Sequence, residues 1–404
     1  MSASALSNSS SPERVCLGNL MKEIDQDSPR EDSKDETAYK TLGEQKLSLD
    51  SVYPFSSKAK SLFSPNITPG NINNINTINN SCIYNITSIL AAFSSQKSTI
   101  TLQKKLAEMS KEDLEDIIKE MKGYFSSIIK NKNGNYFVSD LLKVCSKEQR
   151  IEILKELGNH IIDDCIDEYG THPIQTLIEL ASSEEEYKLL LFYFNDFKKI
   201  LKATLDENGT YVIQKLIVHI PEKNRMGFNL IFVKFICILA MDMYGVCTAI
   251  KFINYTKNEI IEKQLLNLIL SNFLSIAENQ YGNYLIQNVM RLWWNTKKGI
   301  FLKKICMEKF HKLARNHYSS YVCDIFLKLS NLQEKKILMS MLINSKTAID
   351  NNNCGKIILN KLMNGLNQQN NENKFNGNNN KNKNNKQSKN SKKENGDNKE
   401  ENKK

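Results

Sequence analysis

The chain has 404 residues, of which 40% are hydrophobic and 25% charged, so it holds enough apolar material for a sizeable core and is not a wholly disordered protein. Its nine cysteines are widely spaced, with no C-x-x-C or Cys/His cluster, which excludes a disulfide framework and a zinc module and favours a reducing compartment. The formal charge of +10 is unevenly placed: residues 1–90 hold 8 basic and 10 acidic side chains, residues 371–404 hold 10 lysines and 5 acids, and +7 remains between them.

Residues 1–88 are predicted to form a disordered N-terminal arm. They are rich in Ser, Asp, Glu and Lys and include an Asn/Ile run at 71–80, so they cannot bury enough surface to offset the entropy of ordering. The N-terminus lacks the basic and apolar regions of a secretory signal. The most apolar stretch of the chain, Phe228 to Met241, is interrupted by Lys234 and is too short to span a bilayer. We therefore expect a soluble intracellular protein.

The middle of the chain, residues 89–365, repeats a short motif with a period of about 36 residues. In residues 281–287 the motif is aromatic, Gly, small polar, aromatic, two apolar residues and Gln, and similar strings occupy 133–139, 169–175 and 208–214. The spacings between successive anchors are 36, 36, 39, 36, 37, 37 and 36 residues. With serine allowed in place of the anchor glycine, the eight anchors are Ser98, Gly134, Gly170, Gly209, Gly245, Gly282, Ser319 and Gly355.

The period predicts helices. Positions +3, +4, +7 and +8 after each anchor are nearly always apolar, which is the buried stripe of an amphipathic helix. About twelve residues after most anchors a helix start signal follows, and three of the four signals are capping boxes. The signals are Ser110, then Ser146 with Gln149, Ser183 with Glu186, and Asn331 with Glu334. The sequence thus predicts an all-α solenoid in which each repeat buries its apolar face against its neighbours.

The eight in-phase copies of the aromatic-Gly-Asn-Tyr-x-x-Gln string resemble the Pumilio (PUF) repeat family of RNA-binding proteins, over residues 90–365. The resemblance implies a curved right-handed solenoid of eight three-helix repeats. In that family the second helices line a concave surface that holds single-stranded RNA, one base per repeat. Inter-repeat packing is expected for Trp293 and Trp294, which follow the apolar stripe of repeat six.

Positions +1 and +5 lie four residues apart on a helix, so their side chains are expected to meet a base edge together, while the +2 side chain stacks between bases. Repeat five, with Val246, Cys247 and Ile250, is expected to leave its base unread or weakly read. The RNA-binding residues implied by the resemblance are Thr99 and Gln103; Asn135, Tyr136 and Ser139; Thr171, His172 and Gln175; Thr210, Tyr211 and Gln214; Asn283, Tyr284 and Gln287; Ser320, Tyr321 and Asp324; and Lys356 and Asn360.

Repeats six and seven carry the most specific implication. Asn283 with Gln287 matches the uracil reader of the family, and Ser320 with Asp324 is similar to its guanine reader, although Asp is one methylene shorter than the usual Glu. Because RNA runs antiparallel to the repeats in this family, the two repeats would read 5′-GU-3′, the centre of a UGU element. Repeat eight departs from the uracil pattern that the first U requires.

The resemblance implies a monomeric binding protein for UGU-containing mRNA 3′-untranslated regions (3′-UTRs), acting in the cytoplasm with effector proteins in translational repression or decay. No phosphate-binding loop, G-x-S-x-G or H-E-x-x-H motif is present, so we expect no enzymatic activity, cofactor, metal or membrane contact. Two alternatives stay open: a nuclear or nucleolar factor acting on ribosomal RNA precursors, and a protein-interaction scaffold. Residues 366–404, rich in Asn and Lys, are predicted to be a disordered tail that is inert or contacts nucleic acid non-specifically.

Overall fold

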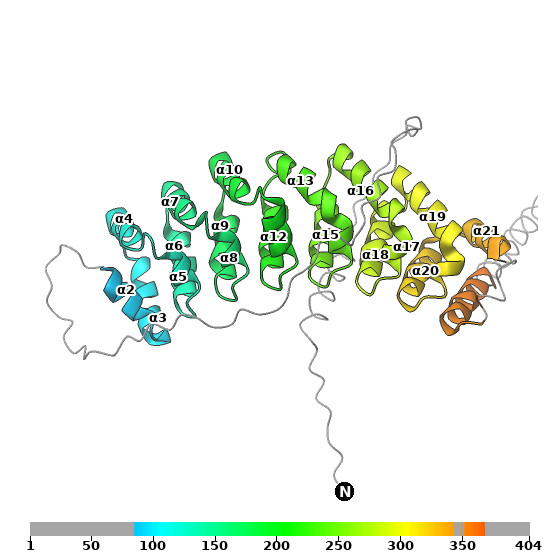
Figure 1. Cartoon of the computed structure of the whole chain (residues 1–404), viewed down its shortest axis with the longest axis horizontal. Coiled ribbons are helices and arrows are strands. Elements are labelled where there is room, and N and C mark those ends of the chain that lie inside the picture. The colour runs from blue at the N-terminus through cyan, green and yellow to red at the C-terminus, as the bar shows by residue number, and fades with distance from the viewer. Residues whose placement is uncertain (1–84, 343–348, 350, 368–404) are drawn as a thin grey trace, which may run out of the picture.

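A computed structural model describes residues 85–342, 349 and 351–367 (Figure 1). Most of the predicted arm and tail lies outside these residues. The described part of the chain contains helices and no strand, which confirms the all-α fold class. Its first helix begins at Ile86, three residues before the expected start of the repeats. No helix in this part is both long and apolar enough to cross a membrane.

Three rows of helices recur along the chain. The first-helix row is α2 (Ile86–Ala92), α5 (Phe125–Ile129), α8 (Ile161–Cys165), α11 (Phe197–Thr204), α14 (Ile236–Ala240) and α17 (Phe273–Ala277). The second-helix row is α3 (Gln96–Leu106), α6 (Gly134–Val144), α9 (Thr171–Leu180), α12 (Gly209–His219), α15 (Gly245–Asn254), α18 (Gly282–Trp293), α20 (His317–Leu329) and a helix over 353–367. The third-helix row is α4 (Lys111–Glu120), α7 (Lys147–Leu157), α10 (Glu184–Tyr193), α13 (Met226–Phe232) with the 3₁₀ helix η2 (Val233–Phe235), α16 (Glu259–Ser271), α19 (Lys297–Leu313) and α21 (Leu332–Leu342).

The repeats stack in chain order. Each helix of the second-helix row from α3 to α20 packs against the next one in the row. In Figure 1 the repeats form an arched row, with α4, α7, α10, α13 and α16 along its convex edge. The predicted apolar stripe is the core of this stack, since Val212, Ile213, Leu216 and Ile217 are at most 1% exposed. Each repeat therefore completes its core only with its neighbours.

Helix α19 departs from the expected pattern of three separate helices per repeat. It runs unbroken for 17 residues and ends at Leu313, which lies six residues before the anchor Ser319. The equivalent residue of the preceding repeat, Ile276, lies in the separate helix α17, because the helix is interrupted at Asn272 between α16 and α17. The third helix of repeat six and the first helix of repeat seven are thus fused into one element.

The anchor glycines allow each second helix to begin against a backbone carbonyl of the first-helix row. A Cβ atom on Gly282 would lie 2.3 Å from the carbonyl oxygen of Ile276, and one on Gly209 would lie 2.4 Å from that of Ala203. Both carbonyls belong to the residue six positions before the anchor. These distances are too short for any Cβ atom, so a side chain here would push the two helices apart.

The two serine anchors solve the same problem with a hydrogen bond. Ser98 Oγ donates to the carbonyl oxygen of Ala92 at 2.8 Å, and Ser319 Oγ donates to that of Leu313 at 2.7 Å. Each acceptor again lies six residues before the anchor. Serine also brings a Cβ atom, but its hydroxyl gains a hydrogen bond to the carbonyl that the methyl group of alanine would only repel.

A capping residue lies three positions before every anchor. The Asp206 carboxylate, for example, accepts from the backbone N–H groups of Asn208 and Gly209 at 2.9 and 2.8 Å. Such bonds satisfy the amide groups that the start of a helix leaves without intrahelical partners. The residues at this position are Ser95, Asn131, Asp167, Asp206, Asp242, Asn279, Asn316 and Asn352. The position extends the repeat motif three residues upstream of the anchor.

The predicted start signals of the third helices are confirmed. Ser146 and Ser183 form capping boxes with Gln149 and Glu186. Asn331 and Glu334 exchange backbone-to-side-chain hydrogen bonds of 2.9 and 2.8 Å at the start of α21. Ser110 also forms a complete box, with Asp113 as its partner.

Trp293 and Trp294 pack between repeats, as predicted. They are 2% and 7% exposed, and the ring of Trp294 lies edge-on to Phe326 of α20 with centroids 5.5 Å apart. The ammonium groups of Lys298 and Lys303 lie 5.3 and 4.4 Å from the Trp293 and Trp294 ring centroids. These cations cover the outer faces of the rings, which adds a cation–π contribution to the packing of α19.

Candidate nucleic-acid interface

The aromatic +2 side chains are exposed along the second-helix row. Tyr136, Tyr211 and Tyr321 are 61%, 45% and 49% exposed, His172 is exposed and Tyr284 is half-buried. Because these residues occupy equivalent positions on helices that pack one against the next, their rings follow one another along one surface. An exposed ring offers its π-face to a base. The structure therefore leaves these five predicted stacking residues accessible.

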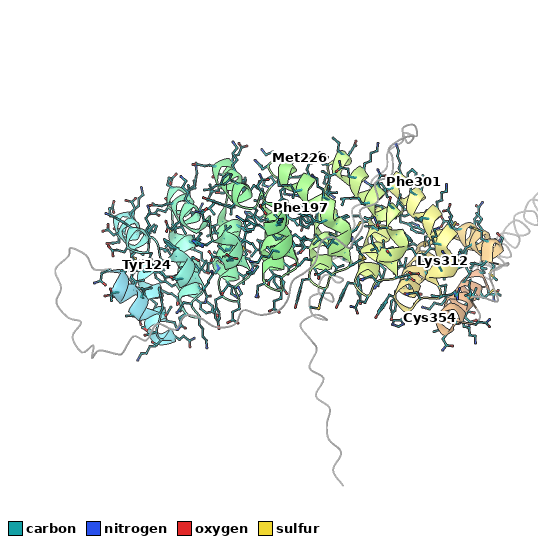
Figure 2. The ribbon with its side chains drawn as sticks, viewed as in Figure 1. Tyr124, Phe197, Met226, Phe301, Lys312 and Cys354 are labelled. Atoms are coloured by element: carbon teal, nitrogen blue, oxygen red, sulfur yellow. The ribbon has the colours of Figure 1, made fainter. Side chains whose placement is uncertain are left out.

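Repeats one, five and eight interrupt this series. Ile100 and Ile357 are 42% and 56% exposed, but Cys247 of repeat five is only 3% exposed. Figure 2 labels Tyr124 near one end of the arched row and Cys354, three residues before Ile357, at the other end. The aromatic surface thus covers repeats two to four and six to seven, with a gap at repeat five and aliphatic side chains at both ends.

Asparagine at +1 is buried instead of being presented beside the +5 residue. Asn283 is 1% exposed, and its Nδ2 atom donates to the carbonyl oxygens of Asn279 and Gln280 at 3.0 and 2.9 Å. Asn135 makes the equivalent two bonds in repeat two, at 3.0 and 2.8 Å. In the structure the +1 amide satisfies carbonyls of the preceding turn and is itself shielded from solvent, so the joint contact of +1 and +5 with a base edge stays a prediction.

Threonine at +1 is also buried and bonds to the next repeat. Thr171 Oγ1 donates to the carbonyl oxygen of Asn208 at 3.3 Å, and Thr210 Oγ1 donates to that of Tyr244 at 3.2 Å. Thr210 also lies 2.7 Å from the hydroxyl of Thr248 on α15. These bonds connect the second helices of repeats three, four and five near the N-terminal ends of α12 and α15.

The +5 glutamines of repeats three, four and six are held by the buried +1 side chains. The Nε2 atoms of Gln175, Gln214 and Gln287 donate to Thr171 Oγ1, Thr210 Oγ1 and Asn283 Oδ1 at 3.1, 3.3 and 2.9 Å. Within the described residues the Oε1 atom of each glutamine has no hydrogen-bond partner. A fixed amide with a free oxygen and a second N–H matches the N3–H donor and carbonyl acceptors of uracil.

Repeats one and two present fewer free hydrogen-bonding groups at +1 and +5. Gln103 Nε2 donates to Asp140 Oδ2 of the next repeat at 2.6 Å, and the buried Thr99 hydroxyl bonds to the Ala92 carbonyl at 3.0 Å. Ser139 Oγ donates to the carbonyl oxygen of its own +1 residue at 2.9 Å. Neither repeat therefore holds a +5 side chain in the arrangement of repeats three, four and six.

Repeat seven differs from all of these because its +5 residue is a carboxylate in two ion pairs. Asp324 Oδ1 lies 2.6 Å from Lys361 Nζ, and Asp324 Oδ2 lies 3.0 Å from Lys328 Nζ. Burial raises the pKa of Asp324, but the hydrogen bonds and charges of the two lysines outweigh burial and hold its pKa below the usual range. Its +1 partner Ser320 donates to the carbonyl oxygen of His317 at 2.6 Å.

Repeats five and eight complete the row. Val246 and Ile250 are fully buried, so α15 presents no polar group at +1, +2 or +5. In repeat eight, Lys356 and Asn360 are both exposed on the helix over 353–367. At this end of the row the exposed Ile357 is therefore accompanied by two exposed polar side chains.

The described residues show no machinery for covalent chemistry. Burial raises the pKa of Cys145 to about 12 and that of Cys237 to about 11, so neither thiol ionises near neutral pH. In the described part of the chain, no group of three or more His, Cys, Asp or Glu side chains could hold a metal ion. The site consists of stacking surfaces and hydrogen-bonding groups, which bind ligands without reacting with them.

Comparisons with known proteins agree with this description. The family model of the NOP9-like PUF repeat domain matches residues 86–357. Pumilio homolog 12 of Arabidopsis thaliana is 29% identical over 249 residues, which cover 60% of this chain but only 41% of that protein.

Solved structures share the fold at low sequence identity. The Puf4 RNA-binding domain, bound to the HO endonuclease RNA 3′-UTR recognition sequence, is 19% identical with a TM-score of 0.62, covering 69% of this chain and 88% of that one. The RNA-binding domain of yeast Puf5p bound to SMX2 RNA is 20% identical with a TM-score of 0.59, covering 68% and 82%. With the family match over most of the described residues, the chain belongs to the PUF repeat family, as a NOP9-like member of this group of non-enzymatic RNA-binding domains.

Proposed function

We propose that this protein binds a single-stranded segment of a ribosomal RNA precursor along its second-helix row and acts in the nucleolus. The row of rings on α6, α9, α12, α18 and α20, of which only that of α18 is half-buried, is the observation that carries the binding mode. Each base–aromatic stack contributes about 1–3 kcal/mol and tolerates any base. Several such stacks in series suffice for affinity, and the lysines of a basic body add attraction to phosphates.

Base selection in this proposal is concentrated in repeats three, four and six. Only there is a +5 glutamine held by its own +1 side chain with a free oxygen. Repeat five has no polar group to offer, and the +5 residues of repeats one and seven are bonded to the following repeat. A protein with few base-selective positions discriminates weakly between RNA sequences. It is therefore better suited to binding one abundant RNA than to selecting its targets among many transcripts.

The choice of ribosomal over messenger RNA rests on two observations. The matching family model is the NOP9-like one, and the irregular triplets depart from the regular code expected of an mRNA binder. Repeat six, with Asn283, Tyr284 and Gln287, is the feature that favours the second candidate, which is binding of UGU elements in mRNA 3′-UTRs.

Crosslinking of the tagged full-length protein to RNA in cells, followed by sequencing, tests the proposal. We expect most crosslinked reads to map to ribosomal RNA precursors and to contain an unpaired segment. The triple variant Tyr136→Ala, Tyr211→Ala, Tyr321→Ala should lose these crosslinks, while Tyr124→Ala, which removes an equally exposed ring outside the second-helix row, should keep them. Reads concentrated at UGU elements of 3′-UTRs would instead establish the messenger RNA function.

A further inference from the structure

The two lysines at Asp324 occupy both oxygens of the side chain that would read guanine. Lys361 Nζ bonds to Oδ1 and Lys328 Nζ to Oδ2, at 2.6 and 3.0 Å. A carboxylate recognises guanine by accepting from its N1–H and N2–H groups with these same two oxygens. Each oxygen keeps a further lone pair, but both are already paired with an ammonium group, so a guanine edge would compete with the two lysines for the charge of Asp324.

The hydrogen of the partner hydroxyl is engaged as well, which leaves its oxygen as an acceptor. Ser320 Oγ donates to the carbonyl oxygen of His317 one turn earlier, at 2.6 Å. In repeats three, four and six the polar pair is bonded internally and keeps a free acceptor, as Gln287 does with Asn283. Repeat seven instead directs its +5 side chain to Lys361, 37 residues away on the helix of repeat eight. The Asp324–Lys361 contact thus joins repeats seven and eight, whereas Ser320 and Lys328 are bonded within α20.

The same contacts place two ammonium groups on the surface at this end of the row. The side chains of Lys328 and Lys361 are 68% and 49% exposed, and that of Asp324 is 21% exposed. An ammonium group has three N–H donors, and one bond to Asp324 leaves the others directed towards solvent. The cluster carries one negative and two positive charges, and Lys356 adds a further exposed cation to the same helix as Lys361. A phosphate group is the ligand that fits such a site.

We propose that repeat seven does not select guanine: Asp324 orders Lys328 and Lys361, and these two lysines hold a phosphate of the RNA backbone while Tyr321 stacks on whichever base lies there. The proposal rests on the proposed function, since it assumes RNA on the second-helix row. Tyr321 is 49% exposed and is flanked edge-on by His317 at 5.6 Å, so the stacking half of the site stays open. Repeat seven would then contribute affinity and register but no sequence information.

The test measures binding of the full-length protein to RNA decamers that contain UGU, UAU, UUU or UCU at one position and are otherwise identical, by fluorescence anisotropy at two salt concentrations. We expect the wild-type Kd values for the four RNAs to agree within about threefold. Asp324→Asn removes the one negative charge of the cluster and leaves both lysines in place, so it should tighten all four RNAs by a similar factor, about 3- to 10-fold, without creating a preference among them.

A double variant, Lys328→Ala with Lys361→Ala, should weaken binding of all four RNAs several-fold with a shallower salt dependence. Lys336→Ala on α21 is the matched control, because it removes an exposed lysine outside the second-helix row and should leave Kd within about twofold. A tenfold or greater preference of the wild type for UGU that Asp324→Asn abolishes would overturn the proposal and restore the guanine reader. Failure of the wild type to bind any of the RNAs would overturn the proposed function itself.

Discussion

The Nε2 atom of Gln287 donates to Asn283 Oδ1 over 2.9 Å, while Asn283 uses its own N–H groups on two backbone carbonyls. The two residues therefore have different roles, although both belong to the same motif. Asn283 is a buried structural side chain that closes the turn before α18 and orients its neighbour. Gln287, at 7% exposed, keeps a free oxygen and is the residue that can meet a base.

Replacing these two residues should separate stability from base selection. Asn283→Ala removes two side-chain hydrogen bonds to buried-turn carbonyls, of which that of Asn279 also accepts from the Asn283 backbone N–H, and should lower the free energy of unfolding by about 1–3 kcal/mol. Gln287→Ala removes one bond between side chains and should cost less than about 1 kcal/mol, but it should abolish any preference for uracil opposite repeat six. Urea unfolding and anisotropy with RNAs that differ at that base measure the two effects. Equal losses of stability in the two variants would contradict this division of roles.

Replacing an anchor glycine, even by alanine, should lower the stability of the protein. Gly282→Ala forces a methyl group against the Ile276 carbonyl, where the Cβ distance would be 2.3 Å, and should destabilise the protein by about 1–3 kcal/mol. Gly227→Ala is the matched control, because nothing lies within 4 Å of its Cβ position in α13. It should stabilise the protein by about 0.4–1 kcal/mol, since alanine loses less backbone entropy.

Serine should be the better substitute at an anchor. Gly282→Ser meets the same Cβ clash as Gly282→Ala, but its hydroxyl can donate to the Ile276 carbonyl as Ser319 donates to that of Leu313, so it should lose less stability than Gly282→Ala. Thermal unfolding of the three variants gives the order directly. A Gly282→Ala protein as stable as the wild type would show that the helices can separate at no cost.

A buried ion pair makes part of the stability depend on pH. Burial raises the pKa of Glu186, but hydrogen bonds from the Ser182 backbone, Ser183 and Arg150 outweigh it and hold the pKa below its usual range. Because the folded-state pKa is lowered, this stabilisation is complete above the unfolded-state pKa of about 4.3 and is lost as the pH falls through the folded-state pKa. The contribution is therefore full at neutral pH and disappears only in acid.

Glu186→Gln should accordingly lower the free energy of unfolding by about 2 kcal/mol at pH 7, a value typical of hydrogen bonds to charged groups. The difference from the wild type should shrink as the pH falls below the unfolded-state pKa and through the lowered folded-state pKa, where the wild-type carboxylate also becomes protonated. Glu185→Gln, at an exposed pair 3.4 Å from Lys147, should change stability by less than about 0.5 kcal/mol at either pH. Denaturant unfolding across this pH range measures both, and a loss that persists undiminished in acid would assign the effect to packing.

The base opposite repeat five should be interchangeable. Val246, Cys247 and Ile250 are buried and apolar, so α15 has neither an edge reader nor an open stacking surface there. RNAs that differ only at this base should bind with Kd values within about twofold, whereas changing the base opposite repeat six should weaken binding by about tenfold. Anisotropy with a set of single-base RNA variants measures both positions. A strong preference at repeat five would mean that α15 rearranges on binding.

The sequence by itself determined the repeat, the helices and their starts. The anchors recur every 36 to 39 residues, and the capping pairs at Ser146 and Ser183 join residues three positions apart. Both features are local in the chain, so they can be recognised without knowing the tertiary structure. It also determined which +2 side chains carry rings, and the helical period placed those rings on one face of successive second helices. The family resemblance added the surface on which the rings lie.

Only the tertiary structure decided what the polar triplet residues do. Asn283 is buried by the turn before it, and Asp324 is paired with Lys361 in the next repeat, a contact between residues 37 positions apart. The fusion in α19 likewise depends on how repeats six and seven pack. The hydrogen-bond partners of a polar side chain include groups that the packing of neighbouring repeats brings near it. The sequence of one helix therefore cannot show which of its polar residues are already bonded to the next repeat.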